Sequence, residues 1–132
     1  AGTLSAFDLS VFPSLWEGTP ITAFEALAMG KPIVATDADG LLDILTDGHD
    51  AAIVPRRDAD ALAAKIVWAM DHPDERARLS ANAMATGRQY DILTFVHKME
   101  RLYDLLHARA EARQRRGLAG EDLSFLASVR AR

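Results

Sequence analysis

"PSLWEGTPITAFEALAMGKPIVAT", residues 13–36, contains a complete helix signal followed by a strand signal. Thr19 is a good N-cap residue, and Pro20 suits the first helical position, where its missing N–H is no loss. Gly30 is placed to end the helix, and Pro32 prevents its continuation. The last letters, PIVAT, do not alternate between apolar and polar, which is typical of a strand buried on both faces. The stretch therefore predicts a helix that leads into a central strand.

Two further strand signals flank this unit, "FDLSVF" at 7–12 and "AAIVP" at 51–55. The three strands recur about every 20 residues, and each is followed by a helix, which favours parallel βαβ units with right-handed crossovers. "LLDILTDG" predicts a short helix that Gly48 stops. Asp58 is placed to cap an amphipathic helix whose apolar face carries the side chains Leu62, Ile66 and Met70.

After residue 71 the pattern changes to helices alone. Pro73 and the two acids that follow it mark a helix start, and a later apolar stripe is made of Phe95, Met99, Leu102 and Leu106. A complete doubly wound sheet usually has five or six strands. We therefore expect an α/β fold, a partial Rossmann-like parallel sheet of about three short strands with flanking helices and a helical C-terminal extension. The predicted domains are 1–106, the later part of such an α/β domain, and 107–132, an Arg-rich helical tail.

The predicted helix around residue 25 is apolar on nearly every face, as a buried helix would be. Glu25 lies in its middle, and burying a carboxylate without a partner costs several kcal/mol, about 2–7 kcal/mol even for a neutral polar group. The structural interpretation is a hydrogen bond with Thr22 or a salt bridge with Lys31. The functional one places Glu25 beside Thr22 at the carboxyl edge of the sheet, where ligands bind in such folds and where a helix N-terminus suits phosphate. A carboxylate there can accept two hydrogen bonds from a vicinal diol such as that of a ribose.

Composition excludes several classes of protein. The 132 residues contain no cysteine, which excludes disulfides, a thiolate nucleophile and a thiolate metal site. The four histidines share no metal-ligand spacing, so no metal site is predicted. No apolar run approaches the roughly 18–20 residues of a membrane span, and no signal peptide opens the chain, so a cytoplasmic location is expected. The net charge is −4 and the part before residue 107 is acidic, which argues against nucleic acid as a partner.

The quoted stretch resembles the donor-binding part of retaining glycosyltransferases of the GT-B fold, the family-4 group with glycogen-synthase and sucrose-synthase relatives. The mark of that family is two glutamates separated by seven residues, and Glu17 and Glu25 match it. The flanking "PS", "EG" and "EALAMGKP" match as well, and the similarity covers roughly residues 7–106. The resemblance implies that residues 1–106 are the later part of a nucleotide-sugar (donor) binding domain. It also implies transfer of a sugar from a nucleotide diphosphate sugar to an acceptor hydroxyl, with retention and without a required metal or other cofactor.

The resemblance also implies residue roles. Glu17 would meet the hydroxyls of the donor sugar near the reacting carbon, and Glu25 would hold the ribose hydroxyls. The backbone of the segment between them would line the sugar and the diphosphate, at Gly18, Thr19, Ile21 and Thr22. The sequence departs from the family at Thr19–Pro20, where phenylalanine and glycine are usual, at Asp39, which replaces the first of two glycines, and at Asp43 and Ala51.

Several interpretations stay open. The chain is either part of such a transferase, a non-catalytic module that binds a nucleotide sugar, or a sugar-nucleotide epimerase or phosphorylase of the same architecture; a glycosidase with two carboxylates is a further alternative. Family members also have a pair of basic residues near the start of the donor-binding domain and a separate N-terminal GT-B domain, and the resemblance places both outside this chain. We therefore expect the 132 residues alone to be inactive and to self-associate through an unpaired sheet edge. The Arg-rich run 109–116 is interpreted as a solvated helix face, or as a contact with the missing domain or with anionic lipid at the inner face of the membrane. The acceptor is unknown.

Overall fold

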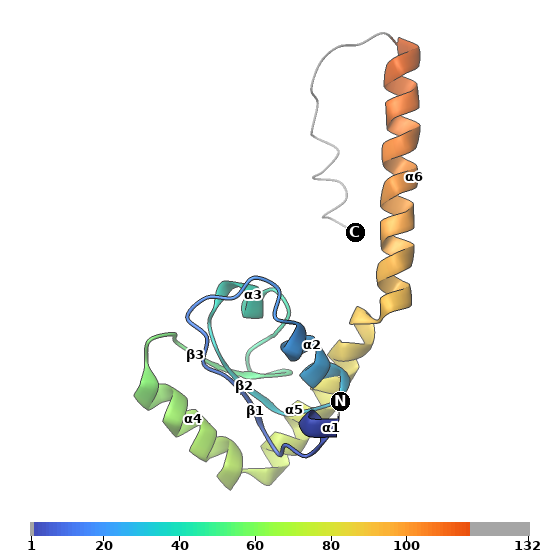
Figure 1. The fold of residues 1–132 in the computed structure, drawn as a ribbon. Coiled ribbons are helices and arrows are strands. Elements are labelled where there is room, and N and C mark those ends of the chain that lie inside the picture. Colours follow the sequence, from blue (N-terminus) through green and yellow to red (C-terminus); the bar gives the residue numbers. More distant parts are fainter. Residues whose placement is uncertain (1, 117–132) are drawn as a thin grey trace. The chain divides into compact units, whose positions relative to one another are not determined.

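Three short parallel strands form one sheet in the computed structural model, which describes residues 2–116 (Figure 1). The strands are β1 (Ser10–Phe12), β2 (Ile33–Thr36) and β3 (Ala52–Val54), in the order β1-β2-β3. In the register, Ser10 lies opposite Ile33, and Val34 lies opposite Ala52. The parallel three-stranded sheet that the sequence predicts is confirmed.

Helices follow each strand and then continue alone, as the sequence predicts. Figure 1 labels α1 (Gly2–Ser5), α2 (Ile21–Ala28), α3 (Asp39–Leu42), α4 (Ala59–Asp71), α5 (Pro73–Gly87), the 3₁₀ turn η1 (Arg88–Tyr90) and α6 (Ile92–Arg116). The first of these, α1, has no counterpart in the sequence prediction.

The helix α2 begins one residue later than predicted and ends where predicted. Its N-cap is Pro20, not Thr19, and the helix starts at Ile21. At the other end Gly30 has a φ of 60°, its N–H donates to the carbonyl of Leu27, and the N–H of Lys31 donates to the carbonyl of Ala26. This pair of bonds is a Schellman motif, which needs a residue with positive φ and therefore favours glycine. The prediction of Gly30 as the helix end is confirmed, and that of Thr19 as its N-cap is wrong.

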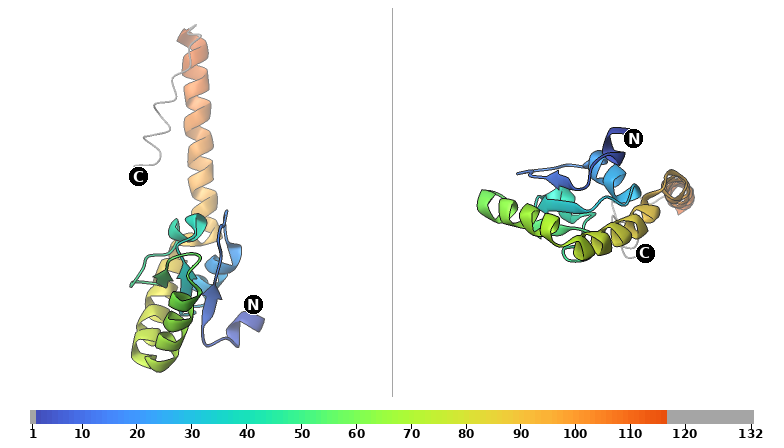
Figure 2. Two further views of the ribbon diagram at one scale, coloured as in Figure 1. Left: turned by 90° about the vertical axis from the view of Figure 1, so that its left-hand side faces the viewer. Right: turned by 90° about the horizontal axis from the view of Figure 1, so that it is seen from below.

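The central strand β2 is buried along its whole length because helices cover both faces of the sheet. On one face, Ile33 and Ala35 belong to a cluster with Leu27 of α2 and Leu41 of α3. On the other face, Val34 belongs to a cluster that includes apolar side chains of α4 and α5. The helix α5 follows α4 along the chain and packs chiefly on α2 (Figure 2).

The helix α2 is covered on one face only. Its buried residues are Ala23, Ala26 and Leu27, whereas Ile21 is 69% exposed and Glu25 is exposed. The prediction of a helix buried on all sides, with a carboxylate enclosed in it, is therefore wrong. Most of the helix is alanine and other small or apolar residues, whose sequence pattern does not distinguish the covered face from the open one.

Two further local predictions need correction. The helix α3 ends at Leu42 and not near Gly48, because the N–H of Thr46 donates to the buried carboxylate of Asp50 (2.7 Å), which ends the helical hydrogen bonding. In α4, Asp58 caps the helix as predicted, by accepting from the N–H of Ala61. Met70, however, is 51% exposed and lies outside the core.

The chain divides into two compact units, Ala1–Thr94 and Phe95–Arg132, of which the structure describes residues 2–94 and 95–116. The first contains the sheet and α1 to α5. The predicted division at residues 106 and 107 falls inside α6, and the part of the predicted helical tail after residue 116 lies outside the described residues. The site described below belongs to the first unit alone.

Candidate functional site

Three loops meet at the carboxyl edge of the sheet, one after each strand. They are the β1–α2 loop of residues 13–20, the β2–α3 loop of residues 37–38 and the β3–α4 loop of residues 55–58. In parallel sheets this edge is where ligands bind, because the loops and the helix N-termini gather there. The candidate site is therefore built from residues that are far apart in the sequence.

Glu17 is held by a side chain of its own loop. The hydroxyl of Ser14 donates to Glu17 Oε1 over 2.6 Å, and Glu17 is half-buried. Ser14 is fixed in turn, since the hydroxyl of Thr36, at the end of β2, donates to its carbonyl oxygen. The carboxylate of Glu17 is thus oriented by a short chain of hydrogen bonds that starts in the central strand.

The first turn of α3 lies directly against the backbone that follows Glu17. A Cβ placed on Gly40 would lie 2.0 Å from the carbonyl oxygen of Gly18 and 2.7 Å from that of Glu17. Real Cβ atoms essentially never approach another atom within 3.0 Å. Only glycine at position 40 allows α3 to come this close to the loop.

Arg56 joins all three loops. Its Nη2 donates to Asp39 Oδ1 (2.8 Å), its Nε to Asp37 Oδ1 (3.2 Å) and its Nη1 to the carbonyl of Leu15 (3.3 Å). The hydrogen bond from Arg56 lowers the pKa of Asp39 below its usual value, and the same bond raises the pKa of Arg56. Arg56 and Asp37 are not among the residues predicted from the sequence, although each follows directly on the end of a predicted strand, a signal that could have identified them.

The structure places the predicted donor-binding residues around the N-terminus of α2. Gly18 and Thr19 are exposed in the loop, and Ile21, Thr22 and Glu25 lie on the open face of the helix. Among the described residues no side chain caps this helix end; the N–H of Ala23 donates to the carbonyl of Pro20. The first backbone N–H groups of α2 and the carboxylate of Glu25 are therefore presented on one open surface.

A pocket of about 250 Å³ lies elsewhere, between the segment after α3 and the end of α5. Asp50 lines it with His49 and Tyr90, but both oxygens of its carboxylate are occupied, by the N–H of Thr46 and by the hydroxyl of Thr86 (2.8 Å). Asp43 also lines this pocket. The buried carboxylate thus serves to fix the loop, and none of the predicted donor-binding residues lines this pocket.

Residues 2–116 contain neither a group of metal-ligating side chains nor a helix that could span a membrane. No three His, Asp or Glu side chains in this range are grouped as a metal ion would need. None of the helices in the same range is both long and apolar enough to span a membrane.

Comparison with known proteins supports the predicted resemblance. The family model described as "Glycosyl transferases group 1" matches residues 3–86. An N,N'-diacetylbacillosaminyl-diphospho-undecaprenol alpha-1,3-N-acetylgalactosaminyltransferase of Campylobacter jejuni is 32% identical over 97 residues, which are 74% of this chain and 26% of that protein.

Solved structures agree in fold. Sucrose-phosphate synthase from Thermosynechococcus elongatus superposes with a TM-score of 0.76 at 29% identity, over 81% of this chain and 27% of its own. The Anabaena protein HepE, solved in complex with UDP, superposes with a TM-score of 0.73 at 23% identity, over 77% of this chain and 29% of its own. The chain thus spans about a quarter of the length of these three proteins.

Proposed function

Because this chain belongs to the Glycosyl transferases group 1 family and has the fold of GT-B glycosyltransferases, we propose that it is the donor-binding part of a retaining glycosyltransferase. The whole protein would transfer a sugar from a nucleotide diphosphate sugar to an acceptor hydroxyl. The observation that supports this most is the common placement of Glu17 and Glu25 around the open N-terminus of α2.

Glu25 is proposed to bind the ribose of the donor. It lies on the open face of α2 with Ile21 and Thr22, about one turn beyond the helix N-terminus. A diphosphate at that N-terminus would be stabilised by the free N–H groups and by the helix dipole. A ribose linked to the diphosphate would then lie over the first turns of the helix, where the carboxylate can accept from its two hydroxyls. The complex of HepE with UDP supports a nucleotide of this type in a protein of the same fold.

Glu17 is proposed to bind the sugar that is transferred. Its carboxylate is preorganised by Ser14, and Gly18 beside it leaves room for a ligand, since a Cβ there would meet nothing within 4 Å. In the reaction the bond between the anomeric carbon and the diphosphate oxygen breaks, and its electron pair leaves with the diphosphate. The acceptor oxygen forms the new bond on the same face of the sugar, and its proton passes to the leaving diphosphate. Fixed dipoles and hydrogen bonds that stabilise the departing charge supply most of the catalysis in this type of reaction.

The remaining predictions of the sequence are part of the same proposal. Transfer without a required metal, a cytoplasmic location and an N-terminal GT-B domain that supplies the acceptor surface all stay predictions. So do the contact of the Arg-rich run 109–116 with lipid and the inactivity and self-association of the 132 residues alone.

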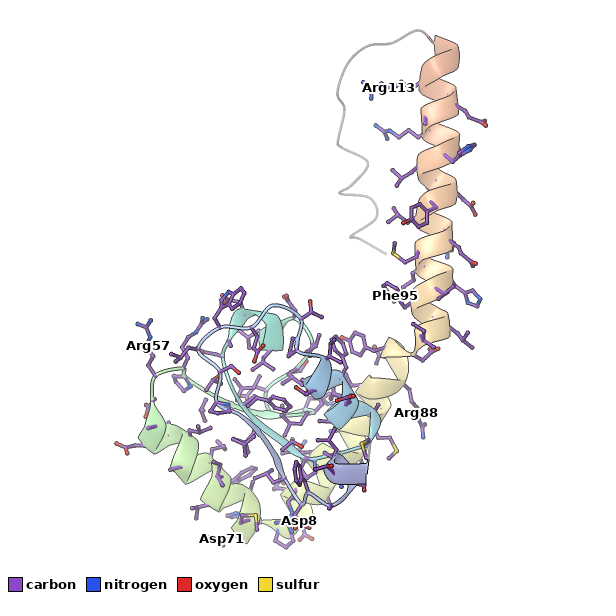
Figure 3. The ribbon with its side chains drawn as sticks, viewed as in Figure 1. Asp8, Arg57, Asp71, Arg88, Phe95 and Arg113 are labelled. Carbon is purple, nitrogen blue, oxygen red and sulfur yellow. The ribbon has the colours of Figure 1, made fainter. Side chains whose placement is uncertain are left out.

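The test uses the full-length protein that contains this chain. Binding of nucleotide sugars is measured by calorimetry, and transfer is followed by analysis of the products and of their anomeric configuration. Glu25→Ala is compared with Asp71→Ala, a matched control at the end of α4, away from the loops of the site (Figure 3). We expect the parent protein to bind the donor, Glu25→Ala to weaken this binding and Asp71→Ala to leave it unchanged. We also expect the transferred sugar to have the same anomeric configuration in the product as in the donor. Binding without transfer would instead indicate a non-catalytic module, and an inverted product would refute retention.

A further inference from the structure

Arg56 connects the three loops of the candidate site through its hydrogen bonds. It follows β3, yet it contacts Leu15 after β1 and both Asp37 and Asp39 after β2. We propose that Arg56 is a positioning residue of the donor site, which holds the loop that carries Glu17 and Gly18 in place. This inference rests on the proposed function, since the loop is assigned there to the sugar and the diphosphate.

Arg56 holds the loop of Glu17 and Gly18 from the side of β3. The guanidinium donates to the carbonyl of Leu15, a residue 41 positions away in the sequence, two residues before Glu17. Asp37 orients the arginine, because one oxygen of its carboxylate accepts both from the backbone N–H of Arg56 (2.6 Å) and from its Nε (3.2 Å). Arg56 thus has a fixed base from which it reaches the loop.

The loop is held from a second direction by α3. The carbonyl oxygens of Glu17 and Gly18 lie so close to Gly40 that no side chain fits between them. Arg56 also fixes the start of α3, through the ion pair of 2.8 Å with Asp39. One residue therefore sets both the position of the loop and the position of the helix turn on which the loop rests.

The geometry of these contacts favours arginine over lysine. Three different nitrogens of the guanidinium reach three different acceptors, and the planar group holds them in a fixed relation. An ammonium at the end of a flexible chain would keep the charge near Asp39, but it would not hold Leu15 and Asp37 at the same time. The lysine variant therefore separates charge from positioning.

Arg56 is expected to contribute more to the position of the loop than to the free energy of unfolding. The side chains of Arg56 and Asp39 are 33% and 69% exposed, and ion pairs this exposed add little to the free energy of unfolding. A shift of about 1 Å in a group that binds the reacting sugar can lower the rate about 100-fold. Loss of Arg56 should accordingly affect turnover much more than global stability.

The experiment compares Arg56→Ala and Arg56→Lys with Arg57→Ala in the full-length protein. Arg57 is the matched control, because it is the next arginine of the same β3–α4 loop, is exposed, and its side chain points outward, away from the sheet (Figure 3). Two quantities are measured: hydrogen exchange of the amides in residues 39–43, and kcat and KM for transfer from the nucleotide sugar. The exchange measurement needs no activity, so it tests the anchoring independently of the proposed function.

We expect Arg56→Ala to raise hydrogen exchange in residues 39–43 about tenfold, as the loss of hydrogen bonds to a charged group would, and Arg56→Lys to raise it less because its ammonium keeps the charge near Asp39. We expect kcat to fall about 10- to 100-fold, with KM changed little and with Arg57→Ala close to the parent protein in both measurements. Unchanged exchange in Arg56→Ala would show that Arg56 does not anchor α3, and unchanged kcat would show that it does not position the loop; either result would overturn the inference. If Arg56→Ala raises exchange but the parent protein itself transfers no sugar, the anchoring is supported and the proposed function is refuted.

A second arm separates positioning from simple neutralisation of charge. If Arg56 acted only by neutralising Asp39 next to an anionic donor, Arg56→Ala combined with Asp39→Asn would recover the rate. We expect the double variant to remain as slow as Arg56→Ala, because neither substitution restores the hydrogen bond to Leu15. Recovery of kcat to near the parent value would refute the positioning role.

Discussion

Gly40→Ala tests the packing of α3 on the loop of Glu17 most directly. The added Cβ would lie 2.0 Å from the carbonyl oxygen of Gly18, and this distance has to rise to at least 3.0 Å, so the loop or the helix must move by about 1 Å. Neither partner is the tip of a flexible side chain, because both close contacts are with backbone atoms. Overpacking of this kind typically costs about 1–3 kcal/mol of the free energy of unfolding.

The same movement displaces the proposed donor site. Gly18 is where the loop turns toward α2, and a displacement of about 1 Å in a group that positions the substrate can lower turnover about 100-fold. We therefore expect Gly40→Ala to lower both the free energy of unfolding and kcat in the full-length protein. Urea unfolding gives the first quantity, and initial rates of transfer at saturating donor give the second.

Gly87→Ala is the matched control for this prediction. Gly87 lies where α5 meets α2, and a Cβ there would lie 2.7 Å from backbone atoms of Leu27 and Ala28, near the far end of α2. We expect it to lower the free energy of unfolding by a similar amount while the folded protein keeps a turnover close to that of the parent. If Gly40→Ala left kcat unchanged, or if Gly87→Ala lowered it equally, the link between the α3 contact and the donor site would be refuted.

Three further predictions concern carboxylates of the site. Glu25→Ala should weaken binding of the nucleoside diphosphate by about 1.5–3 kcal/mol, the usual loss for hydrogen bonds to a charged group. The melting temperature should stay almost unchanged because Glu25 is exposed. If calorimetry showed unchanged affinity in a destabilised protein, Glu25 would have a structural role instead. Glu17→Gln should lower kcat strongly and leave the affinity for free nucleoside diphosphate within a few-fold, since its contact is realised mainly with the sugar in the transition state; equal losses in both quantities would contradict this division of roles. The pKa of Asp39 is lowered by Arg56 in the folded protein, so the contribution of this pair to stability is present above the ordinary aspartate pKa of 3.8 and is lost as the pH falls below it. Asp39→Asn should therefore reduce stability slightly at pH 7 and not at all once the pH lies below the lowered pKa, and a pH-independent difference in urea unfolding would rule out the ion pair as its cause.

The alternation of strands and helices could be predicted from the sequence because its signals are local. Gly30 ends α2 through a positive φ that few other residues adopt, and Asp58 caps α4 through a bond to a backbone N–H three residues away. Apolar runs without alternation indicated that β2 is buried on both faces. Each of these features depends on the residue itself and on neighbours within a few positions.

The candidate site was predicted only in part. The spacing of Glu17 and Glu25 identified the two carboxylates, but their surroundings depend on residues remote in the chain. The sequence predicted that Glu25 is enclosed, whereas the open face of α2 leaves it exposed. Ser14 was noted as part of a motif, and only the structure shows that its hydroxyl orients the carboxylate of Glu17.

The sequence by itself therefore determined the alternation of strands and helices from β1 onward and the parallel pairing of the strands, because hydrophobic periodicity, caps and helix ends act over a few residues. The roles of Glu17 and Glu25 stay predictions. The tertiary structure alone decided which face of α2 is covered, why position 40 must be glycine and how Arg56 reaches a carbonyl 41 residues away. These features arise where three loops meet after the sheet has formed. Their physical cause is close packing and hydrogen bonding between segments that are far apart in the sequence, and no local sequence pattern predicts such contacts.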